Sequence, residues 1–155
     1  MHSDFLQLIA SLAAKLEALT SMAPVRYQTL PKNLPKRGIY LFSDGATHLY
    51  VGRTNRLRQR LAGHCVPSST HFSATFAFRL AREATGATKA TYTAKGSRAA
   101  LVKEPGFAGE FERSKKRLAQ LDLRFVEEAD PMRHALLEIY AAFVLKTPYN
   151  DFDNH

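Results

Sequence analysis

Apolar and polar positions follow a helical period at the start of the chain. The apolar residues there recur at intervals of three and four, at Phe5, Leu8, Ile9, Leu12, Leu16 and Leu19. This spacing predicts an amphipathic helix over residues 4–20, with Ser3 or Asp4 as its N-cap. Prolines then predict a loop, at Pro24, Pro31 and Pro35.

The pattern changes to a period of two over residues 38–42 and 48–53, which enclose Asp44-Gly45. It predicts an antiparallel hairpin. We expect Tyr40 to lie opposite Tyr50, which collects the aliphatic side chains on one face and the two phenols on the other. This register requires a loop with an odd number of residues, because a two-residue turn would move every side chain to the other face. The same register pairs Ile39 with Val51 and Leu41 with Leu49.

The remaining elements follow from spacing and from capping residues. Thr54 is the predicted N-cap of a helix over residues 55–64, and Asp130 followed by Pro131 is the predicted start of a helix that runs to about Lys146. No element is assigned to residues 85–105. Spacing further predicts helices over 73–84 and 107–120 and a half-buried strand over 121–127.

Composition limits the class of function. The chain has 155 residues, of which 45% are hydrophobic, and this fits a single domain with its own core. Its net charge of +8 favours a polyanionic partner. The single cysteine, Cys65, excludes an intramolecular disulfide and a zinc site with cysteine partners. Neither a signal peptide nor an apolar run of about 18 residues is present, so we expect a cytoplasmic protein without a membrane partner.

Several chemically capable residues stand at suggestive spacings. Gly38-Ile39-Tyr40 and Tyr50-Val51-Gly52 flank the predicted turn, Arg60 lies eight residues after the second triplet, and Glu138 lies late in the chain. Together they resemble the GIY-YIG nuclease family, with valine at the centre of the second triplet instead of isoleucine. Two further spacings resemble the restriction-endonuclease branch of that family: His64 is four residues after Arg60, and Asn150 is twelve after Glu138.

The resemblance implies a fold. We expect an α/β (α+β) protein in which a small three-stranded antiparallel sheet of residues 38–42, 48–53 and 121–127 is flanked by helices, as in the GIY-YIG endonuclease fold. The whole chain, 1–155, would then be one nuclease domain. Residues 1–20 would form its N-terminal helix, and 66–120 a family-variable helical insertion.

The resemblance also implies a metal-dependent DNA endonuclease whose site residues line one basin. Glu138 would bind one Mg²⁺ or Mn²⁺, which lowers the pKa of a bound water and stabilises the leaving oxygen. Tyr40, helped by Tyr50 or His64, would take the proton of the attacking water. Arg60 would stabilise the charge of the transition state, and Asn150 would position a phosphate oxygen or a water.

Most of these residues also have an interpretation without chemistry. The two tyrosines would form an ordinary cross-strand aromatic pair. Arg60 would be a solvated helix residue, His64 an idle surface residue, and Asn150 part of a turn.

Glu138 is the only charged residue of the segment 135–143. A carboxylate among so many apolar residues requires a partner or a metal. The alternative to a metal site is therefore an ion pair at the helix edge, with Arg133 or His134.

Further basic residues are predicted to contact the phosphates of DNA, namely Arg53, Arg56, Arg58, Lys115 and Lys116. Two rival functions share the same charge. The first is a nucleic-acid-binding protein that does not cut, and the second is a nuclease directed to RNA. A dimer would suit double-strand cleavage, but the sequence predicts no interface.

Overall fold

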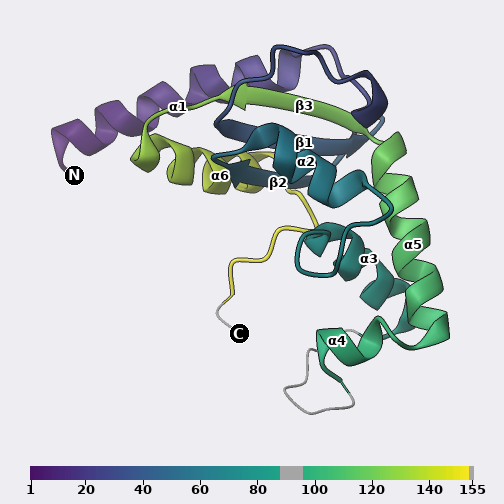
Figure 1. Ribbon diagram of the computed structural model, residues 1–155. Helices are drawn as coiled ribbons and strands as arrows, with labels where there is room; N and C mark the ends of the chain where they lie inside the picture. The colour runs from purple at the N-terminus through teal and green to yellow at the C-terminus, as the bar shows by residue number, and fades with distance from the viewer. Residues whose placement is uncertain (88–95, 154–155) are drawn as a thin grey trace. The chain divides into compact units, whose positions relative to one another are not determined.

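The computed structural model describes residues 1–87 and 96–153 (Figure 1). The chain divides into two compact units. Unit 1 comprises Met1–Arg58 and Leu121–His155, and unit 2 comprises Gln59–Gln120. Each unit is described separately below.

Unit 1 contains a three-stranded antiparallel sheet. Its strands are β1 (Gly38–Asp44), β2 (Thr47–Thr54) and β3 (Asp122–Glu127), in the order β2-β1-β3. The mixture of helices with a small antiparallel sheet confirms the predicted α+β class. Since β1 is central, β2 is an edge strand whose outer side is not paired with another strand of the sheet.

The hairpin register differs from the prediction. Tyr40 lies opposite Gly52, and Tyr50 lies opposite Phe42. The predicted odd loop is wrong, because β1 and β2 are joined by a two-residue turn, Gly45-Ala46. Glycine suits the first turn position, whose φ is +57°. A bulge between Phe42 and Ser43 shifts the pairing by one residue and restores the predicted faces.

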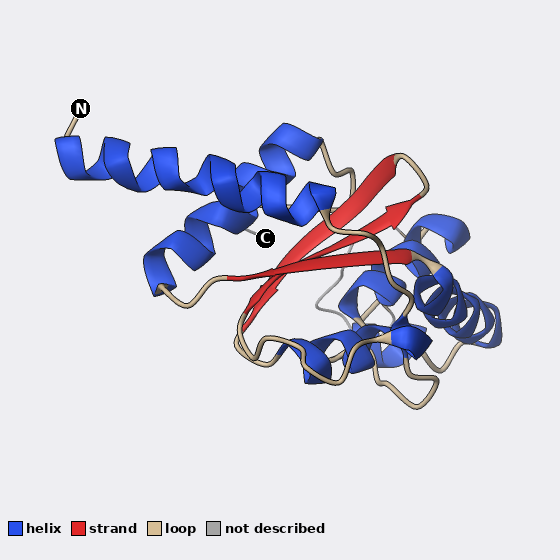
Figure 2. Cartoon of the chain, turned by 90° about the horizontal axis from the view of Figure 1, so that it is seen from above, coloured by secondary structure: helices blue, strands red, loops and turns tan. Residues whose placement is uncertain are grey.

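Two helices cover the aliphatic face of the sheet, α1 (Ser3–Ser21) and α6 (Pro131–Leu145) (Figure 2). Asp130 caps α6 by accepting a hydrogen bond from the backbone N–H of Arg133 at 2.8 Å, as the sequence predicted. Burial of apolar surface in this layer stabilises unit 1. The core cluster comprises Leu12, Leu16, Leu19, Ile39, Leu41, Val51, Leu137 and Ala141.

The loop between α1 and β1 is held by backbone hydrogen bonds. It contains one 3-10 turn, η1 (Tyr27–Thr29). Val25 forms an isolated bridge with Leu123 of β3. Further along, the carbonyl of Lys36 accepts a hydrogen bond from the backbone N–H of Leu57 at 2.8 Å. These bonds fix the loop at both ends.

Unit 2 is helical in its described residues. Its elements are α2 (Leu57–Cys65), which begins in unit 1, α3 (Thr75–Thr85), α4 (Arg98–Leu101) and α5 (Pro105–Gln120). Thr54 is not the N-cap of α2, because the helix begins three residues later. The sequence assigned no element to the region that contains α4. Helices α3 and α5 pack through aromatic side chains, with the Phe78 ring centroid 5.0 Å from that of Phe107.

None of the helices in the described part of the chain is long and apolar enough to cross a bilayer.

Candidate active site on strand β2

The glycine of the second triplet makes room for a tyrosine of the first. Gly52 lies directly opposite Tyr40 on the neighbouring strand. A Cβ atom at Gly52 would lie 2.2 Å from the phenolic oxygen of Tyr40. The Tyr40 ring therefore lies across β2 only because residue 52 lacks a side chain. Tyr40 is 1% exposed.

The two predicted tyrosines lie together. The ring centroids of Tyr40 and Tyr50 are 6.2 Å apart at an interplanar angle of 51°. Phe42 completes the group, with its ring centroid 6.0 Å from that of Tyr40 in an edge-to-face arrangement. Such tilted pairs are favourable for aromatic rings. The predicted grouping of both phenols on one face is confirmed, although their register was wrong.

Gly38 of the first triplet serves a different contact. A Cβ atom there would lie 2.2 Å from the carbonyl oxygen of Val126 on β3. Glycine at this position lets β1 and β3 approach closely. At both triplet positions a side chain would therefore clash with a residue of a neighbouring strand.

Asn150 binds the outer side of β2. Its Oδ1 accepts a hydrogen bond from the backbone N–H of Val51 at 2.9 Å, and its Nδ2 donates to the Val51 carbonyl at 2.7 Å. Thr147 Oγ1 donates to the same Oδ1 at 2.7 Å, and the Tyr149 N–H donates to the carbonyl of Leu49. The amide therefore takes the place of a further strand on this edge and fixes its position.

Glu138 pairs with a strand residue. Its Oε2 accepts a hydrogen bond from Nε of Arg53 at 2.8 Å, and the two side chains are 20% and 49% exposed. The alternative partners on α6 are engaged elsewhere. Arg133 pairs with Glu128 through Nε and Oε1 at 3.2 Å. Sequence reasoning expected an ion pair as the alternative to a metal, but with a partner on the same helix.

His134 anchors α6 to the first triplet. It is 1% exposed, its Nε2 lies 3.0 Å from the carbonyl oxygen of Gly38, and its Nδ1 accepts from Nε of Arg37 at 3.4 Å. An imidazole that accepts at Nδ1 carries its proton on Nε2, which then donates to the carbonyl. Sequence reasoning missed this positioning role. The spacing of His134 with Leu137 and Ala141, which places it on the buried stripe of α6, contains the signal.

The predicted catalytic residues of unit 1 thus all belong to or contact one stretch of four residues, Tyr50–Arg53. Alternation along β2 places Tyr50 and Gly52 on one face, and Val51 and Arg53 on the face that α6 covers. The phenols and Glu138 therefore approach this stretch from opposite faces of the sheet. The sequence predicted one shared basin, whereas in the structure the shared feature is the edge strand itself.

The other two predicted catalytic residues belong to unit 2. Arg60 on α2 donates from Nη1 to the Ser73 carbonyl at 3.0 Å and from Nη2 to Thr75 Oγ1 at 2.9 Å. These bonds tie α2 to the start of α3. Arg60 is only partly buried.

His64 is fully buried, contrary to the idea of a surface residue. Burial, reinforced by the nearby charge of Arg60, lowers the pKa of His64 to about 3. The imidazole is therefore neutral near pH 7 and is a weak base. Burial also raises the pKa of the adjacent Cys65 thiol to about 12, so this thiol stays protonated.

One predicted nucleic-acid contact is wrong. Lys115 is 2% exposed, and its Nζ donates to the carbonyls of Pro67 at 2.5 Å and Ser69 at 3.0 Å. The ammonium also pairs with Glu112 at 2.6 Å. A lysine held in this way serves the fold of unit 2. Its place four residues after Phe111, on the apolar stripe of α5, is the signal that was overlooked.

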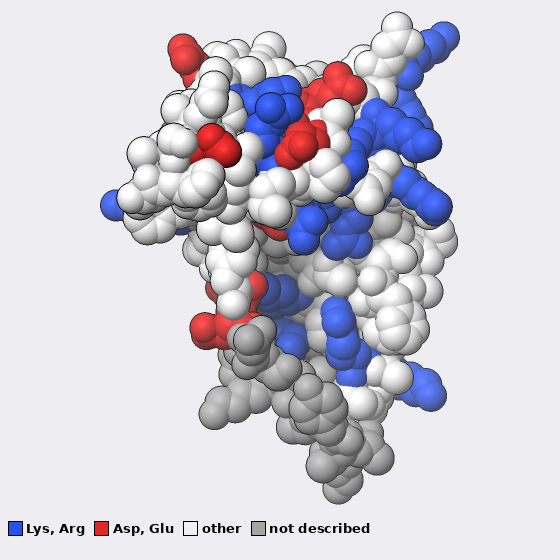
Figure 3. All heavy atoms as spheres, turned by 90° about the vertical axis from the view of Figure 1, so that its left-hand side faces the viewer, with Lys and Arg blue, Asp and Glu red and all other residues white. Residues whose placement is uncertain are grey.

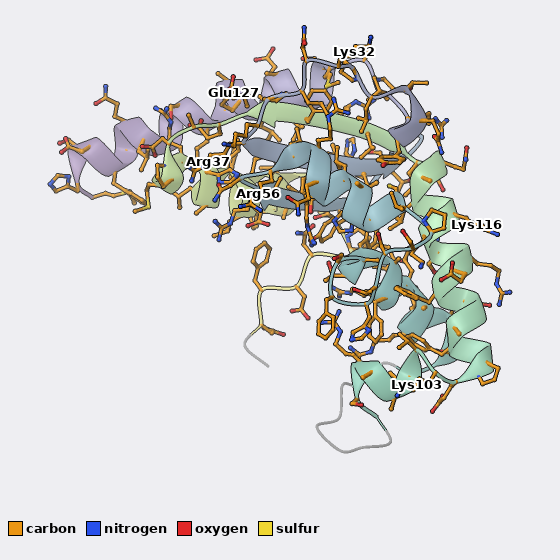
Figure 4. All side chains as sticks on the ribbon, viewed as in Figure 1. Lys32, Arg37, Arg56, Lys103, Lys116 and Glu127 are labelled. Carbon is orange, nitrogen blue, oxygen red and sulfur yellow. The ribbon has the colours of Figure 1, made fainter. Side chains whose placement is uncertain are left out.

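The other residues predicted to contact DNA differ in whether other groups of the protein hold their side chains. Arg56 and Lys116 are exposed and project from the backbone (Figure 4). Arg58 is exposed but donates from Nη2 to the carbonyls of Pro31 at 2.6 Å and Lys32 at 3.1 Å. Arg53 is held by Glu138.

Among the predicted catalytic residues of unit 1, only Glu138 has a carboxylate that could bind a hard cation. The described residues contain no group of three or more His, Cys, Asp or Glu side chains suited to a metal. Mg²⁺ keeps several water ligands and commonly uses one or two carboxylates together with substrate phosphates. Glu138 satisfies this minimum. A cation bound there would compete with Arg53 for the Glu138 carboxylate.

No family model, no curated protein and no solved structure matches this chain.

Proposed function

We propose that the protein is a divalent-metal-dependent endonuclease of the GIY-YIG type that hydrolyses DNA phosphodiester bonds. The observation that supports it best is the convergence on Tyr50–Arg53. Residues from distant parts of the chain, Tyr40, Glu138 and Asn150, all contact this one stretch of an edge strand. The basic composition supports an anionic polymer as substrate.

In this proposal the side chains divide the work, and the phosphate would have to bind at the edge of β2, which the phenols and Glu138 reach from opposite faces. The phenolic oxygen of Tyr40 or Tyr50 accepts the proton of the attacking water as its own O–H proton passes to solvent, and the water oxygen bonds to phosphorus as the bond to the leaving oxygen breaks. Arg60 of unit 2 would stabilise the charge of the transition state, as the family resemblance implies, and would have to exchange its bonds to Ser73 and Thr75 for phosphate oxygens. Glu138 would hold the cation, whose chemistry when bound would be to lower the pKa of a water and to supply positive charge.

Two residues act differently from the expectation. Asn150 is a positioning residue in this proposal, since both ends of its amide bind the Val51 backbone. His64 is neutral, because its pKa is lowered to about 3. It is therefore not a cationic phosphate ligand, and the phenols are the preferred proton acceptors.

The test is cleavage of supercoiled plasmid in Mg²⁺ or Mn²⁺, with EDTA as the blank and structured RNA as a second substrate. Glu138→Gln removes the charge that holds the cation, so nicking should fall by about 100-fold or more. Glu127→Gln is the matched control, because Glu127 is an exposed glutamate at the end of β3 in the same unit. Full nicking by Glu138→Gln would exclude the assignment of Glu138.

A second candidate is a nucleic-acid-binding protein without cleavage. The ion pair between Arg53 and Glu138 favours it, since a guanidinium already neutralises the only charged residue of the segment 135–143. A wild-type chain that shifts duplex DNA in a gel but leaves plasmid intact in both metals would establish this function and exclude the first.

A further inference from the structure

Charge is distributed unevenly along the sequence of unit 1. Residues 26–58 contain seven Lys or Arg residues and a single acid, Asp44. Residues 121–153 of the same unit contain seven acids and three Lys or Arg residues. The net positive charge of unit 1 therefore resides in the loop before β1, the hairpin and the start of α2. Lys and Arg side chains are exposed on the face drawn in Figure 3.

Hydrogen bonds fasten the basic loop to the start of α2. Nη2 of Arg58 donates to the carbonyls of Pro31 and Lys32, and the Leu57 N–H donates to the carbonyl of Lys36. Together they join residues 31–36 to residues 57–58, which are more than 20 positions later. The guanidinium of Arg58 is thus used to hold the backbone that presents the lysines.

The side chains carried by this scaffold are open to solvent. Lys32, Lys36 and Arg56 are all exposed, and we name these three residues the basic loop surface. Lys32 lies at the upper margin of the molecule in Figure 4. Neither lysine forms an ion pair with any described residue. An ammonium that has no internal partner is available to an external anion.

This surface borders the candidate active site. Gly38 pairs with Thr54, so the loop enters β1 beside the residue where β2 ends. Arg53, which binds Glu138, precedes Thr54 directly. Lys36 and Arg56 each lie two positions from this pair, so a chain of phosphates that reaches Glu138 passes close to this part of the basic loop surface.

We propose that the basic loop surface binds the sugar-phosphate backbone of duplex DNA next to the bond that is cut, and that Arg58 is the positioning residue that holds it. This inference rests on the proposed function for the identity of the polymer. Exposed ammonium and guanidinium groups neutralise phosphates without reading sequence.

The distribution of apolar side chains favours a nucleic acid over a membrane. Amphipathic surfaces that insert into membranes combine basic residues with exposed Trp, Phe or Leu. Among the described residues, no large apolar side chain within 26–58 is exposed. The exposed ones lie elsewhere, including Phe5, Phe72, Phe143 and Phe152.

The experiment measures binding of fluorescent duplex DNA by anisotropy over a series of salt concentrations, in EDTA. Each phosphate contact contributes about 0.9 to the slope of log K against log [salt]. Lys32→Ala/Lys36→Ala should lower that slope by about 1.8, equally for duplexes of different sequence. The control is Lys103→Ala/Lys146→Asn, which removes the same charge from two other exposed lysines. Asparagine suits position 146, where φ is 51°.

Arg58 is tested by a change that conserves its charge. Arg58→Lys keeps one positive charge but replaces the guanidinium that spans two carbonyls by a compact ammonium. If Arg58 only contacted phosphate, the slope would stay at the wild-type value. If it positions the lysines, the slope should fall by about 1 or more, while the melting temperature shows that the chain remains folded.

The outcomes separate this inference from the proposed function. A lowered slope in the lysine variant, with no plasmid nicking by the wild type, supports the surface and refutes the nuclease. An unchanged slope, or an equal loss in the control, refutes the surface even if the wild type cuts. Sedimentation with phosphatidylserine vesicles but no binding to duplex would likewise refute it in favour of a lipid partner.

Discussion

The two units hold their predicted site residues by contacts of very different range. In unit 1, Arg53 binds Glu138 over 85 positions of sequence, and Asn150 binds Val51 over 99. In unit 2, Arg60 reaches its partners over 13 and 15 positions. The unit 1 contacts exist only when the whole sheet and α6 have formed, whereas those of Arg60 need only two neighbouring helices. Changes at the buried β2 contacts should therefore affect fold and activity together.

The largest effect is expected from a glycine exchange on β2. Gly52→Ala places a methyl group where the buried Tyr40 phenol lies, so the ring must move within a packed layer. Overpacking of this kind costs about 1–3 kcal/mol. We expect a corresponding loss in the free energy of unfolding, measured by urea denaturation, and loss of nicking.

The matched change in unit 2 is Gly106→Ala. A Cβ atom at Gly106 meets nothing within 4 Å, and the residue lies in α5. Alanine in a helix should stabilise by roughly 0.5–1 kcal/mol. The steric account of the second triplet would be wrong if both variants unfolded at the same urea concentration.

The next largest effect is expected from acid, which should lower the stability of the protein through His64 in unit 2. The pKa of His64 is lowered from its ordinary value of 6.5 to about 3, first by burial and then by Arg60. Below pH 6.5 the unfolded chain binds a proton that the folded chain does not. The contribution of His64 to stability is thus complete above pH 6.5 and is lost as the pH falls from 6.5 towards 3. The melting temperature should fall over this range.

His64→Gln should flatten this acid dependence. His2→Gln, at an exposed histidine of unit 1, is the control and should leave it in place. Parallel melting curves for His64→Gln and wild type between pH 4.5 and 7 would show that another group causes the acid loss.

Sequence patterns correctly predicted the features that depend on neighbouring residues alone. The start of α6 was predicted because Asp130-Pro131 is a complete capping signal within two residues. The faces of the hairpin were predicted because alternation fixes them. The register was wrong because a bulge compensates for a two-residue turn, and the sequence does not distinguish this pair of features from one odd loop.

The partners of the polar residues could not be predicted in the same way. Arg53 and Glu138 meet only through the packing of α6 on β2, which no spacing encodes. Lys115 looked like part of a solvated basic cluster because the carbonyls that bind it, from Pro67 and Ser69, lie in a distant loop. Local patterns show that a charge exists, and the tertiary fold decides what neutralises it.

The smallest effect on stability, and the sharpest on mechanism, is expected from Arg53→Met. The ion pair with Glu138 is half exposed on the arginine side, so its loss should cost less than about 1 kcal/mol. If Glu138 holds the cation, removal of the competing guanidinium should lower the Mg²⁺ concentration for half-maximal nicking several-fold. Arg56→Met, at an exposed arginine three positions later, is the control. If Arg53→Met instead raised that Mg²⁺ requirement, the guanidinium would not compete with the cation, and Arg53 would belong with the residues that bind phosphate.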